Sequence, residues 1–414
     1  MVTVLDRLGA ICGERYAREA GPVDTVGGVP ARWVAAPGSG SGLGEVVAVA
    51  AERKLAVVAR GAGTKLDWGA APSRVDILID TGRLAGLRDR APGDLTATIG
   101  AGTPLRAAQS VLGAAGQRLA LDAGSGSATV GGVLSSGEAG PLRFEYGAPR
   151  DLLLGVEFAR ADGVVTRASG KDGYDLGRVL CGSYGTLGLI ASATVRVHPL
   201  PAARAWVLRT VRTPIEVHGL TGDLLGSTLA PAAIEMDLPA DPTAGLPRRA
   251  TPGTLAVLLE GSPAGVRGRA GAVMSLLGGD ARVSLAEPDW WGRPPFGPGE
   301  VALKLVAPIA DLHAAIYAFR DAAGATLPVR GSAGVGVVYA ALPAGMPSAR
   351  AGAVLAAVRT TLFMRGGSCT VLDGPGRVRA AVDQFGDVPG RDLMRRLKER
   401  FDPAGTLAPD RMPG

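Results

Sequence analysis

The chain has 414 residues, 47% of them apolar and 20% charged, so it can bury a large core and we expect more than one domain. Its formal charge is +6, but the basic residues are scattered and form no Lys/Arg-rich run, which argues against a nucleic-acid partner. Cys12, Cys181 and Cys369 lie far apart and the three histidines are isolated. The sequence therefore gives no support for a disulfide framework, an iron-sulfur cluster, a zinc site or a serine triad.

The N-terminal sequence MVTVLDRLGAICGERYAREAG carries charges throughout and lacks the apolar core of a signal peptide. No apolar run approaches the roughly 18 to 20 residues that span a bilayer. We therefore expect a cytoplasmic protein without a transmembrane segment, which could reach the inner face of the membrane only through a partner.

The first hundred residues predict short strands alternating with helices. In chain order these are a helical segment over 1–28, a strand over 31–37, a Gly/Ser loop PGSGSG, a helix over 43–54, and strands over 55–59, 75–80 and 95–100. Thr103 and Pro104 then predict the start of a helix, as a hydroxyl N-cap followed by proline in the first helical position.

The section LDAGSGSATVGGVLSSGEAG, residues 121–140, is rich in Gly and Ser but also contains Val130, Val133 and Leu134. A solvated linker would lack these apolar residues, so we expect ordered backbone that packs closely against a neighbour. A hairpin over 151–168, a short helix in YDLGRVL and a strand over 194–198 follow, and HPLPAAR predicts a linker.

Beyond the linker the pattern changes to longer strands and helices. We expect strands over 254–260, 301–306, 335–342 and 368–372, helices over 264–277, 309–323 and 348–363, and a last helix in DLMRRLKERFDPAG. This alternation predicts a compact sheet with helices on one face.

The stretch VVARGAGTKLDWG, Val57 to Gly69, resembles a phosphate-binding loop. A Rossmann site would need a third glycine and a helix, whereas Leu66 and the sequence LDWGAAPS follow here, so Asp80, 17 positions after Gly63, is a misleading acid. A Walker loop is also absent. What remains is a glycine loop whose backbone N–H groups can form an anion nest, with Thr64 and Lys65 as further donors.

Four motifs in order carry a family resemblance. RGAGTK (60–65), ATVGG (128–132), SSGEAGPLRFEYGAPRDLLLG (135–155) and GYDLGRVLCGSYGTLGLI (173–190) resemble the PCMH-type FAD-binding domain of the vanillyl-alcohol oxidase superfamily. Within it they are most similar to the FAD-binding subunit of bacterial glycolate oxidase and related actinobacterial FAD-linked oxidases. The resemblance covers roughly 30 to 200 and, less tightly, LMRRLKERFDPAGTLAPDRM near the C-terminus.

The resemblance implies an α+β fold: a two-subdomain PCMH-type FAD-binding domain and an α+β cap domain with an antiparallel sheet. The implied limits are an N-terminal helical segment over 1–28, the FAD-binding domain over 29–200, the substrate cap over 201–385, and a C-terminal helix and tail over 386–414 that return to the FAD domain.

The resemblance also implies which residues contact FAD. The first loop would donate backbone N–H groups to the diphosphate, the second would form the opposite wall, where a side chain on either glycine would collide with the cofactor, and SSG would follow the ribityl chain. The implied residues are Arg60, Gly61, Ala62, Gly63, Thr64, Lys65, Thr129, Val130, Gly131, Gly132, Ser135, Ser136, Gly137, Gly140, Asp151, Gly182, Gly185, Thr186, Gly188 and Ile190. For the serines and Asp151, turn capping is the alternative role.

Many relatives bind FAD covalently through a histidine in an R-x-G-G-H pattern. Thr64 stands at that position and the second loop has no cysteine, so the resemblance implies noncovalent FAD. Two segments depart from the family pattern, namely SGKDGYD, which is shorter than usual, and the tail Ala408-Pro409-Asp410-Arg411.

FAD would carry the redox chemistry, and the implied function is oxidation of a small 2-hydroxyacid or related alcohol. The substrate carboxylate would need cations, and the hydroxyl proton a base, which the sequence does not identify. The candidate polar residues are Lys304, Arg330, Tyr339 and Arg365 in the cap, and Trp68, Arg143 and Tyr146 beside the FAD loops.

An alternative function is a flavin-binding accessory or electron-relay subunit that turns over no substrate itself. In either case a catalytic paralogue and an iron-sulfur subunit are the implied partners, because this chain has no cluster-binding cysteines. A third alternative is an NADPH-dependent enolpyruvyl reductase with the same flavin domain, although no match to its catalytic residues is evident.

Overall fold

The computed structural model describes residues 2–170, 176–241 and 251–413. The chain forms two compact units. The first unit comprises Met1–Ala139, Tyr146–Leu200 and Pro389–Gly414, and the second unit comprises Gly140–Glu145 and Pro201–Val388. Each unit buries its own apolar core.

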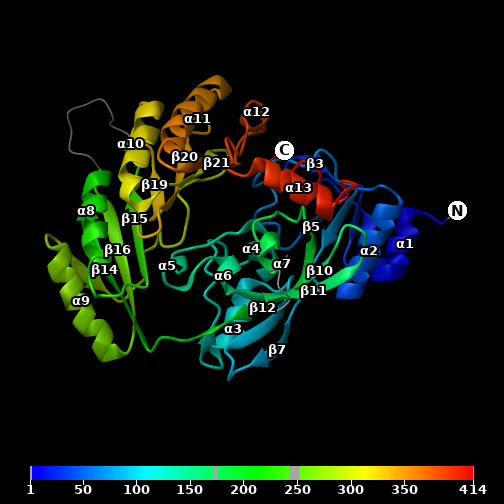
Figure 1. Ribbon diagram of the computed structural model, residues 1–414, viewed down its shortest axis with the longest axis horizontal. Coiled ribbons are helices and arrows are strands. Elements are labelled where there is room, and N and C mark those ends of the chain that lie inside the picture. The colour runs from blue at the N-terminus through cyan, green and yellow to red at the C-terminus, as the bar shows by residue number, and fades with distance from the viewer. Residues whose placement is uncertain (1, 171–175, 242–250, 414) are drawn as a thin grey trace. The chain divides into compact units, whose positions relative to one another are not determined.

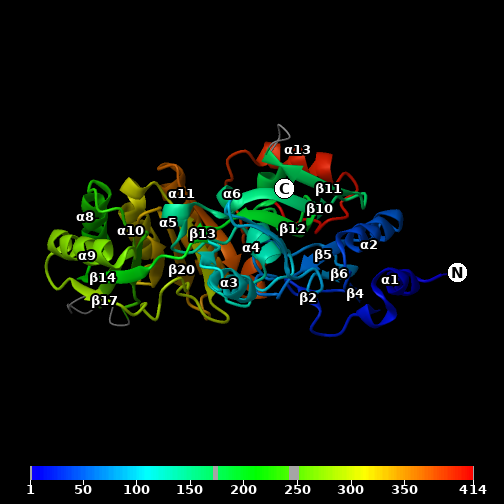
Figure 2. The ribbon, with the colours of Figure 1, turned by 90° about the horizontal axis from the view of Figure 1, so that it is seen from below.

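The first unit begins with a small, mostly parallel sheet. Its strands, in sheet order, are β1 (Ala17–Glu19), β4 (Trp33–Ala35), β6 (Ile77–Asp80) and β5 (Val57–Arg60), and only β1 is antiparallel to its neighbour. Helices α1 (Val4–Cys12) and α2 (Gly40–Glu52) lie beside this sheet (Figure 2) and bury Leu8, Leu43 and Val47 with Ile77. A separate two-stranded hairpin joins β2 (Thr25–Val26) and β3 (Val29–Pro30).

Two predictions for this region are wrong. The helical segment expected over 1–28 ends at Cys12, because Gly13 has a φ of 91° and the chain continues as the 3-10 helix η1 (Glu14–Tyr16) and then β1. The expected loop PGSGSG is partly helical. The Ser39 side chain accepts a hydrogen bond from the Gly42 N–H at 3.0 Å, so it caps α2, which already begins at Gly40.

The rest of the first unit is built around an antiparallel five-stranded sheet. Its strands, in sheet order, are β11 (Val165–Ser169), β10 (Leu153–Ala159), β12 (Leu189–Arg196), β8 (Thr96–Gly100) and β7 (Leu87–Ala91). The expected hairpin is confirmed, because β10 pairs antiparallel with β11. Strand β7 was not predicted, since its charged sequence LRDRA has little apolar pattern.

Short elements connect these strands. They are α3 (Leu105–Gly113), β9 (Gln117–Arg118), α4 (Val130–Ser136), α5 (Arg143–Tyr146), α6 (Pro149–Leu152), α7 (Leu176–Leu180) and β13 (His198–Pro199). Pro104 rather than Thr103 is the N-cap of α3, and the Thr103 hydroxyl donates to the Gly100 carbonyl at 2.7 Å instead. Residues 173–175 of the GYDLGRVL motif lie outside the described residues.

The second unit is an eight-stranded sheet in which every pairing is antiparallel. Its strands, in sheet order, are β17 (Arg282–Ser284), β14 (Ala203–Val211), β16 (Gly253–Gly261), β15 (Ala233–Leu238), β19 (Val329–Ser332), β20 (Val337–Leu342), β18 (Val301–Val306) and β21 (Ser368–Asp373). The antiparallel sheet expected for this part of the chain is therefore confirmed.

Helices cover one face of this sheet. They are α8 (Pro214–Leu225), α9 (Pro263–Leu277), α10 (Leu312–Ala323) and α11 (Ser348–Phe363), which lie along the same side of the strands in Figure 1. Alternate strand residues such as Val257, Leu303 and Val338 pack against them in the core. The intervening residues face the other way, so the sheet has one apolar face and one mixed face.

The linker expected at HPLPAAR instead contains β13 and the start of β14. The remaining elements are η3 (Ile309–Asp311), which lies before α10, α12 (Gly376–Arg379), which follows β21, and α13 (Arg391–Phe401), which belongs to the first unit. After α13 the chain returns to the small sheet, where the Ala408 N–H donates to the Val57 carbonyl at 2.8 Å.

Candidate functional site

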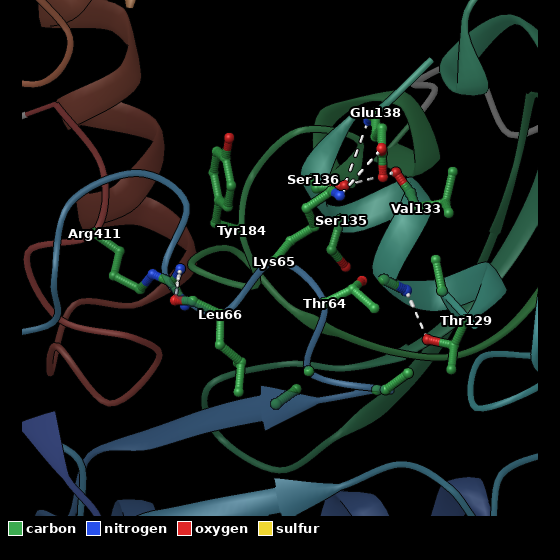
Figure 3. A pocket seen from close by; sticks show the side chains of 16 residues that line it. Thr64, Lys65, Leu66, Thr129, Val133, Ser135, Ser136, Glu138, Tyr184 and Arg411 are labelled. Atoms are coloured by element: carbon green, nitrogen blue, oxygen red, sulfur yellow. Dashed lines mark hydrogen bonds and ion pairs between the residues drawn. The ribbon is translucent and has the colours of Figure 1, made fainter. Parts of the chain in front are cut away.

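A pocket of about 520 Å³, part of it open to solvent, lies within the first unit beside the loop that follows β5 (Figure 3). Three separate stretches of chain and the C-terminal tail meet there. The lining residues are Ala59, Gly61, Ala62, Gly63, Thr64, Lys65, Leu66, Ala128, Thr129, Gly132, Val133, Ser135, Ser136, Glu138, Tyr184 and Arg411. The first two glycine motifs of the sequence therefore form one site.

The first wall is the loop from Gly61 onward. A Cβ on Gly61 would lie 2.1 Å from the Thr129 hydroxyl oxygen, so glycine is what allows this loop to approach the second motif. Gly63 has a φ of 77°, which turns the chain back toward Thr64 and Lys65.

The Arg60 side chain anchors the base of this loop to the small sheet and is not among the lining residues. Its guanidinium contacts Asp24 at 2.8 Å and Asp80 at 3.0 Å. Hydrogen bonds from Arg18, Gly21 and Arg60 hold the pKa of Asp24 well below its usual range despite its burial. Asp80 therefore has a structural partner, consistent with its rejection as a ribose-binding acid.

The second wall is α4 and its N-cap. The Thr129 hydroxyl accepts from the Gly132 N–H at 3.2 Å, and Gly132, Val133, Ser135 and Ser136 face the pocket. A Cβ on Gly131 would lie 2.7 Å from the Ala101 side chain, so this glycine is needed for packing of α4 against the end of β8.

The third wall is the turn after α7. The Tyr184 N–H donates to the Ser135 carbonyl at 2.8 Å and the Gly182 N–H donates to the Leu134 carbonyl at 2.9 Å, so the turn is fixed to α4 by its backbone. The Tyr184 ring lines the pocket, and burial raises the pKa of its phenol. The phenol is therefore neutral at physiological pH.

Three charged side chains line the pocket: Lys65, Glu138 and Arg411. Lys65 Nζ is 3.2 Å from Glu138 Oε1 and lies 4.3 Å from the centre of the Trp68 ring. Arg411 Nη2 donates to the carbonyls of Leu66 and Trp68, at 2.9 and 2.8 Å, and so fixes the first loop from the C-terminal tail. The sequence did not identify Glu138, Tyr184 or Arg411.

Several residues that the resemblance implies are not among the lining residues, and they have identifiable local contacts. The Asp151 carboxylate accepts from the Ala148 N–H at 2.9 Å at the start of α6, which is a capping role. A Cβ on Gly188 would lie 2.6 Å from the Phe158 ring, and the Thr186 hydroxyl donates to the Ser183 carbonyl. The non-lining residues are Arg60, Val130, Gly131, Gly137, Gly140, Asp151, Gly182, Gly185, Thr186, Gly188 and Ile190.

The candidate polar residues of the second unit divide into two groups. Arg330 lies directly opposite Tyr339 across β19 and β20, and Tyr339 lies opposite Lys304 across β20 and β18. This cross-strand row is on the mixed face of the sheet, away from α8 to α11. Arg365 is elsewhere, after α11, and forms an ion pair with Asp311.

Asp237, on β15, extends the row and holds Arg330. Its carboxylate is 2.8 Å from Arg330 Nε, and Arg330 Nη1 also donates to the Arg293 carbonyl at 3.1 Å. The guanidinium lies 5.8 Å from the centre of the Trp290 ring. The carboxylate, the carbonyl and the ring therefore hold the Arg330 guanidinium in one orientation on the mixed face of the sheet.

The remaining aromatic candidates also have contacts. The Trp68 ring makes a cation–π contact with Lys65 Nζ. The Tyr146 hydroxyl accepts a hydrogen bond from Arg118 at 2.6 Å. Arg143 lies in α5 and is half-buried.

Across residues 2–170, 176–241 and 251–413, no group of three His, Cys, Asp or Glu side chains is arranged to hold a metal ion. None of the helices in these ranges has the length and apolarity that a bilayer-spanning helix requires.

Comparison with known proteins agrees with this geometry. The FAD binding domain family matches residues 31–169. An uncharacterised FAD-linked oxidoreductase of Mycobacterium tuberculosis is 26% identical, over 91% of this chain and 90% of that protein. Glycolate oxidase subunit GlcE of Escherichia coli is 35% identical over 29% of this chain and 36% of that protein. A solved alkyldihydroxyacetonephosphate synthase has the same fold, with a TM-score of 0.74 at 16% identity over 98% of this chain and 84% of its own. Residues 31–169 therefore match an FAD binding domain, and the chain is similar over most of its length to an FAD-linked oxidoreductase, which supports an oxidoreductase that uses FAD.

Proposed function

We propose that this oxidoreductase oxidises a small 2-hydroxyacid or a related alcohol, with FAD bound noncovalently in the pocket of the first unit. Bound FAD would supply the hydride acceptor. The proposed cofactor contacts are the lining residues of the two glycine motifs. The implied residues that do not line the pocket would hold these motifs in place through their own local contacts. The proposed domain limits are those expected from the sequence, with 29–200 as the FAD-binding domain and 201–385 as the substrate cap.

The observation that carries the hydroxyacid proposal is the cross-strand row of Lys304, Tyr339 and Arg330. Two cations and a phenol in register on one sheet face are suited to bind a carboxylate, since a guanidinium gives paired hydrogen bonds and an ammonium adds charge. Arg330 is already fixed by Asp237, so little side-chain entropy is lost when it binds an anion. Similarity to a glycolate oxidase subunit supports the same substrate class.

Anaerobic mixing of the purified, yellow protein with glycolate, D-lactate and other 2-hydroxyacids tests the proposal. We expect flavin absorbance to bleach with at least one of them. Arg330→Leu and Lys304→Met are each expected to raise the substrate concentration needed for half-maximal bleaching by roughly tenfold or more. Arg365→Leu, the matched control outside the row, is expected to leave it unchanged. A colourless protein after reconstitution with FAD, or no bleaching by any hydroxyacid, would contradict the proposal.

Noncovalent attachment rests on Thr64, whose exposed side chain lines the pocket where many relatives carry a histidine. A threonine hydroxyl does not form the histidyl bond to flavin. Acid precipitation of the holoprotein is therefore expected to release the yellow colour into the supernatant. Colour that stays with the precipitated chain would show a covalent bond.

Similarity to a named subunit of glycolate oxidase favours a second candidate, an accessory or electron-relay role in a cytoplasmic complex with a catalytic paralogue and an iron-sulfur subunit. The same anaerobic experiment separates the two candidates. Bleaching by the chain alone supports catalysis in this chain, whereas bleaching only after addition of a co-purified partner supports the accessory role.

A further inference from the structure

Glu138 is a buried carboxylate that faces the cofactor pocket. It lies two residues after the end of α4, lines the pocket with Ser135 and Ser136, and is only 7% exposed (Figure 3). Among the lining residues it is the acidic one, in a site whose two glycine loops are otherwise suited to an anion.

The two oxygens of this carboxylate differ. Oε1 contacts Lys65 Nζ at 3.2 Å and accepts from the Gly124 N–H at 3.1 Å. Oε2 is buried and has no hydrogen-bond partner. A buried carboxylate oxygen without a donor is unfavourable, because water is lost and nothing replaces it. The vacant acceptor therefore indicates that a donor belongs in the pocket.

The diphosphate of FAD cannot be that donor, since its oxygens are themselves negative acceptors and would repel Glu138. The sugar hydroxyls on either side of the diphosphate are donors: those of the ribityl chain toward the flavin ring and those of the ribose toward adenine. Glu138 follows Ser135 and Ser136, which the family resemblance assigns to the ribityl side.

We propose that Glu138 is a cofactor-specificity residue whose Oε2 accepts a hydrogen bond from a ribityl hydroxyl of FAD. The inference rests on the proposed noncovalent FAD site and adds a residue to it.

Lys65 makes this arrangement compatible with a polyanion. It is held between the Trp68 ring and Glu138 Oε1, so its charge offsets the carboxylate at the edge of the diphosphate site. Glu138 thus holds Lys65 through Oε1 and accepts a hydrogen bond from a ribityl hydroxyl through Oε2.

The test combines a protein change with a matching cofactor change. Apoprotein of the wild type and of Glu138→Leu is titrated with FAD, with FAD analogues that each lack one ribityl hydroxyl, and with FAD lacking the 2′-hydroxyl of the ribose, and Kd is measured by flavin fluorescence. In the wild type, one ribityl-deoxy analogue is expected to bind roughly 10- to 100-fold more weakly than FAD, the range for a charge-assisted hydrogen bond. In Glu138→Leu, the Kd of FAD itself is expected to rise by the same factor. The deoxy analogue is then expected to bind the variant with the same Kd as FAD does.

Equal penalties for every ribityl-deoxy analogue in the wild type and in Glu138→Leu would overturn the proposal. In a second contrary outcome, the analogue that lacks the ribose 2′-hydroxyl binds the wild type more weakly than FAD but binds Glu138→Leu as tightly as FAD. Glu138 would then accept from the ribose next to adenine, and the ribityl assignment would be overturned.

Lys65→Met separates recognition from support of the loop. It removes the ion pair but leaves the Glu138 carboxylate, so the ribityl-deoxy penalty is expected to persist while the Kd of FAD and of all analogues rises together. Loss of the penalty in Lys65→Met with an unchanged penalty in Glu138→Leu would assign the recognition to Lys65 and overturn the proposal. Because the readout is Kd, failure of hydroxyacid bleaching would contradict the proposed function without affecting this result.

Discussion

Gly61 is the residue at which the two glycine motifs come closest. Replacing it with alanine would place Cβ 2.1 Å from the Thr129 hydroxyl oxygen, so the first loop and the N-cap of α4 must separate. Overpacking of this kind costs about 1 to 3 kcal/mol, and here the strain falls on the pocket itself. We therefore expect Gly61→Ala to weaken FAD binding roughly tenfold or more, as measured by titration of apoprotein with FAD.

Gly93→Ala is the matched control for this substitution. Gly93 also lies in a turn of the first unit, but a Cβ there would meet nothing within 4 Å. We expect its FAD affinity to equal that of the wild type. An unchanged affinity in Gly61→Ala would mean that the two motifs do not need their close approach to hold the cofactor.

At the residue scale, the sequence could predict the glycine motifs because each is a local pattern of backbone requirements. It could not predict Arg411, which stabilises the loop at Leu66 and Trp68 from 345 and 343 positions away. Glu138 was missed for a different reason. It lies inside a recognised motif, but only the fold brings its carboxylate next to Lys65 and leaves Oε2 without a donor.

At the scale of elements, α13 is fixed to the first unit by one buried acid that follows it. Asp402 accepts from the backbone N–H groups of Thr406 and Leu407 and contacts Lys398, which also donates to the Thr186 carbonyl. Removing the carboxylate leaves these donors buried, and breaking a buried pair typically costs about 3 to 5 kcal/mol. We expect Asp402→Ala to lower the free energy of unfolding of the first unit by roughly 3 kcal/mol, measured by urea denaturation.

Asp392→Ala provides the control on the same helix. The Asp392 side chain is 85% exposed and its ion pair with Arg395 lies in solvent, so we expect a change within about 0.5 kcal/mol. Equal effects of the two substitutions would show that the contacts of Asp402 do not hold the C-terminal tail.

The contact between α8 and α10 predicts a pH dependence. The rings of His218 and His313 have centroids 4.4 Å apart, and burial, followed by the charge of His218, lowers the pKa of His313 below 6.5. Asp311 opposes this shift and Arg365 adds to it. Below pH 6.5 the unfolded chain therefore binds more protons at this residue than the folded chain does, and the free energy of unfolding falls as the pH falls.

Denaturation of the wild type and of His313→Gln at several pH values between 5 and 8 checks this dependence. We expect the decrease in stability below pH 6.5 to be smaller in the variant. His198, whose pKa burial also lowers, contributes equally to both proteins and cancels in the comparison. Identical slopes would mean that His313 titrates alike in the folded and unfolded chains.

Some elements of the second unit were predictable from the sequence and others were not. Helix α11 was expected over 348–363 and has those bounds, whereas β15, with the sequence AIEMDL, was missed. Its Glu235 and Asp237 face the mixed side of the sheet. Asp237 pairs there with Arg330 of the neighbouring strand β19, and such a partner is not visible in one short stretch of sequence. The helix over 1–28 was overextended because the apolar spacing gave no sign of how Gly13 would turn the chain.

At the scale of the whole molecule, the chain passes between the two units more than once. The first unit is closed by residues from 389 onward, and the segment Gly140–Glu145 belongs to the second unit although residues on both sides of it belong to the first. In that segment Phe144 packs beside Gly334 and Ile234, and Leu142 packs against the cluster around Trp206. Neither unit is a single continuous stretch of chain. One boundary at the linker HPLPAAR therefore cannot divide the chain into these two units.

The location of the pocket within the first unit predicts how FAD changes thermal unfolding. A ligand that binds only the folded state stabilises it, by about 2.7 kcal/mol at a hundredfold excess over Kd. Two calorimetric transitions are expected in the apoprotein, and they can be assigned by variants. Asp402→Ala should lower the transition of the first unit, and Phe319→Leu, at a fully buried position of the second core, should lower the other.

Added FAD is then expected to raise only the transition that Asp402→Ala lowers, in proportion to the logarithm of the FAD concentration, because the lining residues all belong to the first unit. Gly61→Ala should require a higher FAD concentration for the same rise. A rise confined to the transition lowered by Phe319→Leu would place the cofactor outside this pocket. An equal rise of both transitions would mean that FAD couples the unfolding of the two units, so that the second unit shares in the stabilisation that the pocket residues provide.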